Sequence, residues 1–205
     1  MYDTGRPVKR QCARRPRGKP RERGRKPGMT KRKERLRRCQ LAVPGSSEKM
    51  MTKAAGLEVD HVFLDLEDAV APSAKVDARG QIVTALNTLD WGTTVRCVRV
   101  NDLGTQWCYE DIITVVEGAG ASLDTILVPK IKSGCDVRFV DTLLTQIETK
   151  TGLDHRIGIE VLIEEAEGIM RVEEIAAASP RLEALVFGMG DYSASQGIDP
   201  AAVSR

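Results

Sequence analysis

The stretch RIGIEVLIEEAEGIM, residues 156–170, starts as an apolar strand and runs directly into carboxylates. Side chains along a strand point alternately to two faces, and here the two faces differ in character. One face is aliphatic and suited to packing under helices: Ile157, Ile159, Val161 and Ile163. The other face carries Glu160, Leu162 and Glu164, so we expect it to point into the interior of a barrel.

The end of this stretch holds more acidic residues than a strand end requires. Glu165 and Glu167 come where the next helix would begin, and carboxylates at a helix start are favoured by the helix dipole. We assign that structural role to these two residues. Glu164, at the end of the strand, remains as the candidate for chemistry.

The same pattern of strand and helix recurs along the chain. Further apolar strands are expected at 40–45, 59–68, 93–102, 123–131 and 182–191, separated by helices such as 46–57, 73–89 and 137–152. Strands that alternate with amphipathic helices are typical of βα units around a parallel sheet. No G-x-G-x-x-G follows the first strand, which argues against a dinucleotide-binding fold. The sequence therefore predicts an α/β fold, an incomplete TIM (β/α)8 barrel with about six βα units present.

Polar residues gather at or near the predicted C-terminal ends of these strands. They are Asp65, Glu67, Asp68, Arg99, Asn101, Asp102, Lys130, Glu164 and Asp191. In a barrel this end carries the active site. The carboxylates of Glu164 and Asp191 could share a hard divalent cation such as Mg²⁺, and Arg99 offers a planar fork for a carboxylate or an oxyanion. An internal salt-bridge network that includes Lys130 explains the spacing equally well, and only the position at the barrel mouth favours function.

The bulk composition argues against several classes of protein. Five cysteines without a CxxC pair and only two histidines do not form a disulfide framework or a structural zinc site at any usual spacing. No apolar run approaches the roughly 20 residues that span a bilayer, and the N-terminus lacks the apolar core of a secretory signal. We expect a cytoplasmic protein with no membrane partner.

Residues 1–38 differ sharply from the rest of the chain. They hold 17 Lys and Arg against 3 Asp and Glu, a net charge of +14, whereas the remainder holds 14 against 26, a net charge of −12. A segment so rich in Arg, Pro and Gly has little to bury, so we expect a disordered basic arm before a body at 39–205. The arm is open to three interpretations: an arm that binds nucleic acid or an anionic surface, a transit peptide, or translated sequence before a true start at Met29. We favour disordered or spurious sequence and do not expect nucleic acid as a partner.

Six segments, in order along the chain, carry a family resemblance. They read CQLAVPGSSEKMMTKA (39–54), VFLDLEDAVAPSAKVDAR (62–79), VRCVRVND (95–102), ILVPKI (126–131), IEVLIEEAEGI (159–169) and VFGMGDYSAS (186–195). Together they resemble the HpcH/HpaI aldolase and citrate lyase β-subunit family, and within it the malyl-CoA and β-methylmalyl-CoA lyases. The resemblance implies a TIM barrel, a Mg²⁺ or Mn²⁺ ion, and reversible carbon–carbon cleavage of a 3-hydroxyacyl-CoA such as malyl-CoA to acetyl-CoA and glyoxylate. The partners it implies are an acyl-CoA, a 2-oxoacid and further copies of the chain, as a trimer or hexamer in full-length members.

The resemblance also implies roles for residues at the barrel mouth. Glu164 and Asp191 match the metal ligands of the family. Arg99 matches an arginine that contacts the acyl and carboxylate end of the substrate. Glu67 and Asp68 line the same mouth, where we expect them to support Arg99 or the water shell of the metal.

Two further positions are matched to the substrate and one departs from the pattern. Lys53 matches a basic residue that contacts coenzyme A, and Gly190 matches a position whose backbone touches the substrate. Ser47 stands where close relatives often carry an arginine for the coenzyme phosphates, so weaker coenzyme binding is expected.

Other activities and an incomplete barrel remain open as alternatives. The same scaffold would fit a malyl-CoA thioesterase, a citryl- or citramalyl-CoA lyase, or a catalytically inactive fragment. The chain has no counterpart of the last two βα units or of the family's C-terminal lid, which contributes a catalytic acid to the neighbouring subunit. A closed barrel has no edge strands, whereas six strands leave two. We therefore expect the 205-residue chain on its own to self-associate and to cleave malyl-CoA poorly or not at all.

Overall fold

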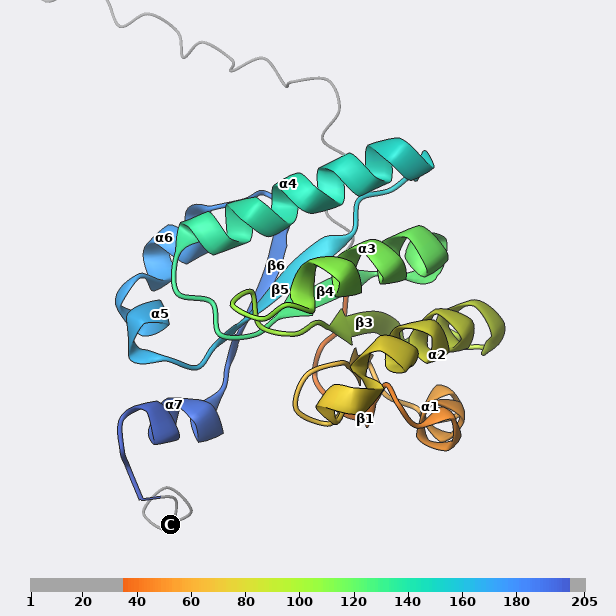
Figure 1. Cartoon of the computed structure of the whole chain (residues 1–205), viewed down its shortest axis with the longest axis horizontal. Helices are drawn as coiled ribbons and strands as arrows, with labels where there is room; N and C mark the ends of the chain where they lie inside the picture. The colour runs from red at the N-terminus through yellow and green to blue at the C-terminus, as the bar shows by residue number, and fades with distance from the viewer. Residues whose placement is uncertain (1–34, 200–205) are drawn as a thin grey trace, which may run out of the picture. The chain divides into compact units, whose positions relative to one another are not determined.

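The computed structural model describes residues 35–199, in which six strands alternate with helices (Figure 1). The strands are β1 (Gln40–Pro44), β2 (His61–Asp65), β3 (Val95–Arg99), β4 (Thr125–Val128), β5 (Gly158–Ile163) and β6 (Leu182–Phe187). The helices are α1 (Glu48–Ala55), α2 (Lys75–Thr88), α3 (Cys108–Ala119), α4 (Gly134–Thr151), α5 (Ala166–Met170), α6 (Val172–Ala177) and α7 (Met189–Ser195), with 3₁₀ turns η1 (Pro72–Ala74) and η2 (Gly120–Ser122). Every strand lies within the range that the sequence predicted for it.

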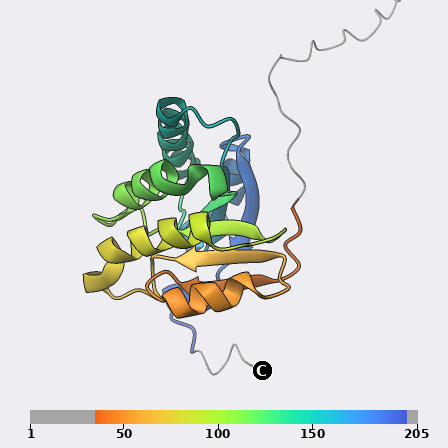
Figure 2. The same cartoon turned by 90° about the vertical axis from the view of Figure 1, so that its right-hand side faces the viewer.

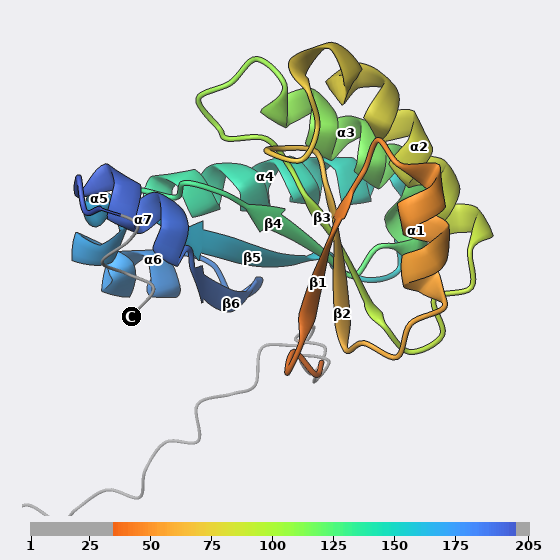
Figure 3. The same ribbon diagram turned by 90° about the horizontal axis from the view of Figure 1, so that it is seen from below.

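The strands form one sheet in chain order, and every neighbouring pair is parallel. Parallel neighbours require a crossover, and helices supply it between successive strands. Helices α1 to α4 lie side by side along one face of the sheet (Figures 1 and 2). The strand direction turns progressively from β1 to β6 (Figure 3), as the twist of parallel strands requires. This is the βα arrangement of a TIM barrel over six units, and the predicted fold class is confirmed.

The two faces of the sheet bury different side chains. Between the sheet and the helices lies the main core, which contains the four aliphatic residues predicted for one face of the 156–165 strand: Ile157, Ile159, Val161 and Ile163. On the opposite face lies a smaller group, called here the inner apolar cluster: Cys97, Leu127 and Leu162, with Phe63 and Val186 packed against it. The predicted alternation along β5 is therefore confirmed.

Within residues 35–199 the sheet ends at β1 and β6, each of which pairs with another strand on one side only. Leu185 and Phe187 of β6, and Met189 after it, are exposed large apolar residues. These features fit the expected edge strands, and self-association remains a prediction. None of the helices in the described part of the chain is long and apolar enough to cross a membrane.

The described part of the chain includes residues 35–38, which the composition groups with the basic arm. Arg35 and Arg37 form ion pairs with acidic residues from much later in the chain: Asp124, Glu160 and Glu183. Composition groups these two arginines with the basic arm because it does not show that their partners lie in later strands. The disorder predicted for the rest of the arm concerns residues outside the described range.

Candidate active site

The C-terminal ends of the strands bring seven charged side chains together, and we call them the mouth cluster. They are Asp65, Glu67, Asp68, Arg99, Lys130, Glu164 and Asp191. The sequence expected Asp191 at the end of the sixth strand, but it lies in the first turn of α7. The strand ends at Phe187, and Gly188 then starts the helix. Asp191 nevertheless reaches the same mouth.

Arg99, the last residue of β3, is held by a two-pronged ion pair. Its Nε and Nη2 atoms donate to the two carboxylate oxygens of Asp65 at 2.7 and 2.6 Å. Its Nη1 atom lies 3.1 Å from Glu67 and 3.5 Å from Asp68, and the guanidinium lies over the Phe63 ring. Burial acts to lower the pKa of Arg99, but the hydrogen bonds and charge of Asp65 outweigh it and raise the pKa. Arg99 is therefore a fixed positive charge in a fixed orientation.

Glu67 is buried between two cations. Its Oε1 atom accepts a hydrogen bond from Lys130 Nζ at 2.6 Å, while Oε2 faces Arg99 Nη1 as an ion pair without a hydrogen bond from the described residues. Lys130 Nζ also lies 3.7 Å from Asp191. Burial raises the pKa of Glu67 despite both cations. Lys130 thus connects Glu67 to one of the two candidate metal ligands.

Glu164 lies one residue beyond β5 and is only 4% exposed. Its Oε1 atom accepts a hydrogen bond from the backbone N–H of Lys130 at 2.9 Å. Lys130 has a positive φ of 52°, a conformation that is uncommon for a residue other than glycine and that recurs at functional sites. Burial raises the pKa of Glu164, and the nearby carboxylates of Glu67 and Asp191 add to that shift. Glu164 is a buried carboxylate that its neighbours do not fully compensate.

Gly188 leaves the space that Glu164 occupies. A Cβ atom at Gly188 would lie 2.6 Å from both Cβ and Oε2 of Glu164, which is closer than non-bonded atoms approach one another in proteins. The residue between β6 and α7 therefore has to be small for Glu164 to hold its position. The sequence analysis did not single out Gly188.

The mouth cluster opens into a cavity of about 250 Å³. Five of the residues predicted for the site line it: Asp68, Arg99, Glu164, Gly190 and Asp191. The cavity extends down to the inner apolar cluster, including Phe63 and Leu162. A polar rim over an apolar base is typical of small-molecule sites.

The donor set of the mouth cluster fits a divalent metal ion. Five carboxylates face two cations, Arg99 and Lys130, so negative charge is in excess. Arg99 is engaged by Asp65 and Glu67, which leaves Glu164 and Asp191 as the least compensated pair. Mg²⁺ prefers one or two protein carboxylates, with water and substrate oxygens completing its shell. The two residues at this cavity match that preference.

The salt-bridge network considered from the sequence forms only in part, through the ion pair of Lys130 with Asp191 at 3.7 Å. Arg99 pairs with Asp65, Glu67 and Asp68, and no ion pair joins it to Glu164 within the described residues. Asp65 is the partner that sequence reasoning placed at the mouth without assigning it a role. Its position at the end of β2, opposite Arg99 in the strand register, is the signal that could have identified it.

Glu165 and Glu167 lie at the start of α5, as predicted. Glu165 forms an ion pair with Lys132 at 2.9 Å, and Glu167 pairs with Arg171 one helical turn later at 3.0 Å. Both are engaged away from the cavity. Their predicted structural role is consistent with these contacts.

Lys53, matched to coenzyme binding, and Ser47, which stands where close relatives often carry an arginine, do not line the cavity. Lys53 is exposed in the last turn of α1 and does not line the cavity. Ser47 is the N-cap of α1, where its side chain accepts a hydrogen bond from the backbone of Met50. The coenzyme role of Lys53 remains a prediction.

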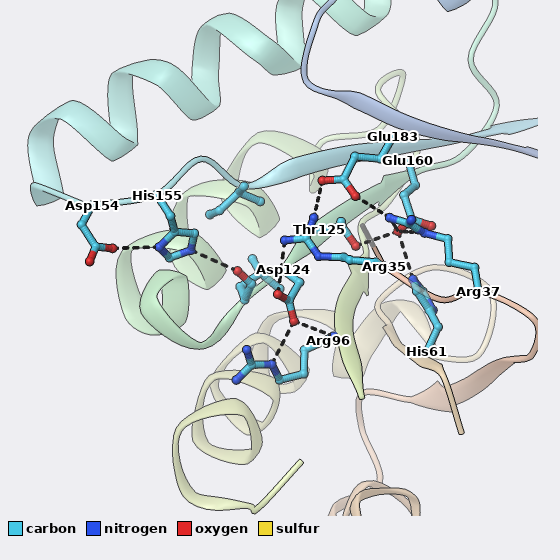
Figure 4. A network of polar contacts seen from close by, with 12 residues as sticks. Arg35, Arg37, His61, Arg96, Asp124, Thr125, Asp154, His155, Glu160 and Glu183 are labelled. Atoms are coloured by element: carbon cyan, nitrogen blue, oxygen red, sulfur yellow. Dashed lines mark hydrogen bonds and ion pairs between the residues drawn. The ribbon is translucent and has the colours of Figure 1, made fainter. Parts of the chain in front are cut away.

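The opposite end of the sheet carries a second charged group, called here the floor cluster (Figure 4). Its members are Arg35, Arg37, His61, Arg96, Asp124, Thr125, Glu160 and Glu183. Glu160 is the centre: its Oε1 atom is 3.0 Å from His61 Nε2, 3.1 Å from Arg37 Nε and 2.9 Å from Thr125 Oγ1. Burial would raise the pKa of Glu160, but these partners lower it.

The floor cluster was not predicted from the sequence. His61, Cys97 and Glu160 come close enough to share an ion, although they are far apart in the chain. The Oε1 atom of Glu160, however, already accepts from a guanidinium and a hydroxyl and contacts the imidazole, and Oε2 accepts from Gln40 Nε2 at 3.5 Å. His61 and Glu160 are accordingly a hydrogen-bonded part of the floor cluster, and Cys97 belongs to the inner apolar cluster.

Comparison with known proteins places this chain in a family. The model of the HpcH/HpaI aldolase/citrate lyase family matches residues 38–203, most of the chain. The chain belongs to that family. The L-malyl-CoA/β-methylmalyl-CoA lyase of Cereibacter sphaeroides (strain ATCC 17025 / ATH 2.4.3) is 47% identical over 169 residues, which cover 82% of this chain and 53% of the lyase. The chain thus spans about half the length of the curated relatives it matches.

Two other members of the family bear on the choice of reaction and metal. A (3S)-malyl-CoA thioesterase from the same Cereibacter sphaeroides strain is 38% identical over 156 residues, covering 76% of this chain and 50% of the thioesterase. The crystal structure of protein CitE from Mycobacterium tuberculosis, in complex with magnesium and acetoacetate, superposes with a TM-score of 0.59 at 29% identity. The superposition covers 78% of this chain and 57% of the CitE chain.

Proposed function

We propose that the mouth cluster is the metal-dependent active site of a carbon–carbon lyase, which cleaves a 3-hydroxyacyl-CoA such as malyl-CoA reversibly to acetyl-CoA and glyoxylate. The observation that carries the proposal is the convergence of Glu164, Asp191 and Arg99 on one cavity, with carboxylates in excess. Membership of the lyase family and the 47% identity to a malyl-CoA lyase support the choice of reaction.

In this proposal Glu164 and Asp191 hold a Mg²⁺ or Mn²⁺ ion, and the ion supplies a Lewis acid for the oxygens of the 2-oxoacid part of the substrate. The structure of CitE with magnesium and acetoacetate supports the choice of metal. Lys130 holds Glu164 through its backbone N–H and keeps Glu67 beside Arg99 through its ammonium.

Arg99 provides the charge stabilisation that the reaction requires. In the cleavage direction the substrate hydroxyl loses its proton, the carbon–carbon bond breaks, and its electrons pass to an enolate of acetyl-CoA, which then takes up a proton. Because Asp65 fixes the guanidinium beforehand, Arg99 can oppose developing negative charge without reorganising. Asp68, on the cavity wall beside Arg99, helps to orient it.

The experiment is to incubate the purified chain with malyl-CoA and measure glyoxylate, with Mg²⁺ and with excess EDTA. We expect glyoxylate to form only with the metal. Full activity in EDTA would contradict a role for the metal. No activity under any condition would favour a catalytically inactive chain.

A second candidate function, hydrolysis of malyl-CoA, is favoured by the 38% identity to a malyl-CoA thioesterase. The two reactions differ in their products. A thioesterase releases free coenzyme A thiol and malate without glyoxylate, so a thiol assay beside the glyoxylate assay distinguishes them. Citryl-CoA and citramalyl-CoA in the same pair of assays test the remaining alternatives.

A further inference from the structure

A lysine outside the cavity is bound in an unusual way beneath the site. Lys75, the first residue of α2, is 6% exposed, and its ammonium donates three hydrogen bonds. They run to the carbonyl oxygens of Leu66 and Glu67, both at 2.7 Å, and to Oδ1 of Asn101 at 2.6 Å. The Trp107 ring lies over the fourth side, 5.3 Å from Nζ. An ammonium has three donors, so Lys75 has none left for a substrate.

Two of these acceptors belong to the turn after β2, residues 66–69, which carries Glu67 and Asp68. The same turn is held from its other side by Asp65, whose carboxylate accepts from the backbone N–H groups of Glu67 and Ala69 at 2.9 and 3.0 Å. Asp65 therefore fixes the N–H groups of the turn, and Lys75 fixes its carbonyl groups. The orientation of the Glu67 and Asp68 side chains therefore depends on the contacts of both Asp65 and Lys75 with the turn.

The third acceptor connects the turn to the next strand. Asn101, just past β3, donates from its backbone and side chain to Asp111 at 3.0 and 2.7 Å. Asp111 in turn accepts from Arg79 Nε at 2.7 Å. Lys75, Asn101, Asp111 and Arg79 are all buried. Lys75 is the member of this chain of contacts that touches the turn carrying Glu67 and Asp68.

Burying an ammonium without a directly bonded carboxylate is costly, and an apolar side chain would fill the same volume without that cost. Burial lowers the pKa of Lys75, although the charges of Asp65 and Asp111 oppose the shift. A residue with this cost needs a compensating role. Two of the three short hydrogen bonds go to carbonyl groups of the turn at 66–69, and holding that turn is the role they point to.

We propose that Lys75 is a positioning residue that holds the 66–69 turn so that Glu67 and Asp68 face Arg99 across the mouth. Its effect on turnover rests on the proposed function, whereas its effect on the turn does not. Lys75 acts through backbone carbonyl groups and does not touch the substrate or the metal.

The test compares Lys75→Met with Arg181→Met in the full chain. Arg181 is an equally buried cation, but its partners Asp141, Glu148 and the Ile157 carbonyl do not include any residue of the mouth cluster. Hydrogen exchange followed by mass spectrometry reports on residues 66–70, where the amides of Glu67, Ala69 and Val70 are hydrogen-bonded. We expect Lys75→Met to accelerate exchange there by roughly tenfold or more, the effect of losing one or two hydrogen bonds. Arg181→Met should leave that peptide close to wild type after correction for global stability.

Two further readouts separate positioning from general destabilisation. We expect Lys75→Met to bind Mn²⁺ within about threefold of wild type, because Glu164 and Asp191 are untouched, while kcat for malyl-CoA falls roughly tenfold or more. Lys75→Gln keeps two donors, so its exchange rate and its kcat should lie between those of wild type and Lys75→Met. This variant takes the place of Lys75→Met if Lys75→Met does not fold.

Unchanged exchange at 66–70 in Lys75→Met, or an equal change in Arg181→Met, would overturn the proposal. Faster exchange with an unchanged kcat would also overturn the positioning role. A wild-type chain without any turnover would favour a catalytically inactive chain, and the exchange comparison would still decide whether Lys75 holds the turn.

Discussion

Glu160 and Glu164 lie on the same inner side of β5 and both are buried, yet their surroundings shift their pKa values in opposite directions. Glu160, in the floor cluster, contacts Arg37, His61 and Thr125, and its pKa is lowered. Glu164, in the mouth cluster, has one backbone N–H from Lys130 and two carboxylates nearby, and its pKa is raised. The difference supports the proposal that one end of the barrel uses charge for stability and the other keeps uncompensated charge available for a ligand.

The charge balance of the two clusters leads to the same conclusion. In the floor cluster the arginines at 35, 37 and 96 face three carboxylates, Asp124, Glu160 and Glu183. In the mouth cluster five carboxylates face Arg99 and Lys130, and even with Lys75 counted below the turn the carboxylates remain in excess. A network whose charges balance is typical of a structural role, whereas an excess of negative charge is typical of a cation site.

The largest expected effect comes from removing each glutamate charge in turn. Glu160→Gln should lower the free energy of unfolding by about 3 kcal/mol, because it removes the fully buried charge that Arg37, His61 and Thr125 contact, although Arg37 keeps its ion pair with Glu183. Glu164→Gln should change stability by less than about 1 kcal/mol, or raise it, since its charge is disfavoured in the fold. Urea unfolding of both variants without added metal measures the difference. Equal losses in the two variants would contradict the division into floor and mouth.

The next largest effect concerns the two arginines of β3. Arg99→Lys keeps the charge but not the two-pronged contact with Asp65, so kcat/KM for malyl-CoA should fall roughly 10²–10³-fold. Arg96→Lys is the matched control, because Arg96 lies on the same strand and pairs with Asp124 in the floor cluster. Its activity should stay near wild type. A near-normal rate for Arg99→Lys would instead favour a purely structural ion pair.

A smaller effect is expected from Gly188→Ala, which adds one methyl group against Glu164. The displaced carboxylate should weaken Mn²⁺ binding by about tenfold, as other changes that misplace a metal ligand do. Gly80→Ala, in α2 with open space around the new methyl group, is the control. Calorimetric titration compares the two variants. Unchanged Mn²⁺ affinity in Gly188→Ala would show that Glu164 does not need its present position.

The smallest effect is a difference in pH dependence. Because the pKa of Glu160 is lowered in the fold, its contribution to stability is present above the unfolded pKa of about 4.3 and is lost as the pH falls through the folded pKa. The pKa of Glu164 is raised, so its charge destabilises the fold as the pH rises above the same unfolded value. The stability gap between wild type and Glu160→Gln should therefore narrow in acid. A gap that widens below pH 4 would contradict the assignment.

The sequence predicts the sheet well because its signal is local. Each strand is an aliphatic run with a polar end, and the alternation in 156–170 sets which face of β5 is inside. The residues of the mouth could be identified for the same reason, since strand ends of a parallel barrel meet. Asp191 was placed in a strand rather than a helix because Gly188 and Gly190 give no clear start signal for α7.

What the sequence does not predict depends on contacts between distant residues. Arg35 and Arg37 look like part of a basic arm until Glu160 and Glu183, more than a hundred residues later, are seen beside them. Lys75 looks like a surface residue of a helix until its three acceptors are known. Composition and periodicity carry no information about such partners.

The most direct test of the account is a Mn²⁺ titration followed by electron paramagnetic resonance. Wild type should bind one ion, and Glu164→Ala and Asp191→Ala should each weaken that binding by roughly 100-fold or more. Thr125→Val, which removes one contact of Glu160 while keeping the fold, should bind Mn²⁺ as wild type does. Retained binding in both mouth variants, or a loss caused by the floor variant alone, would contradict the claim that the mouth cluster is the metal site.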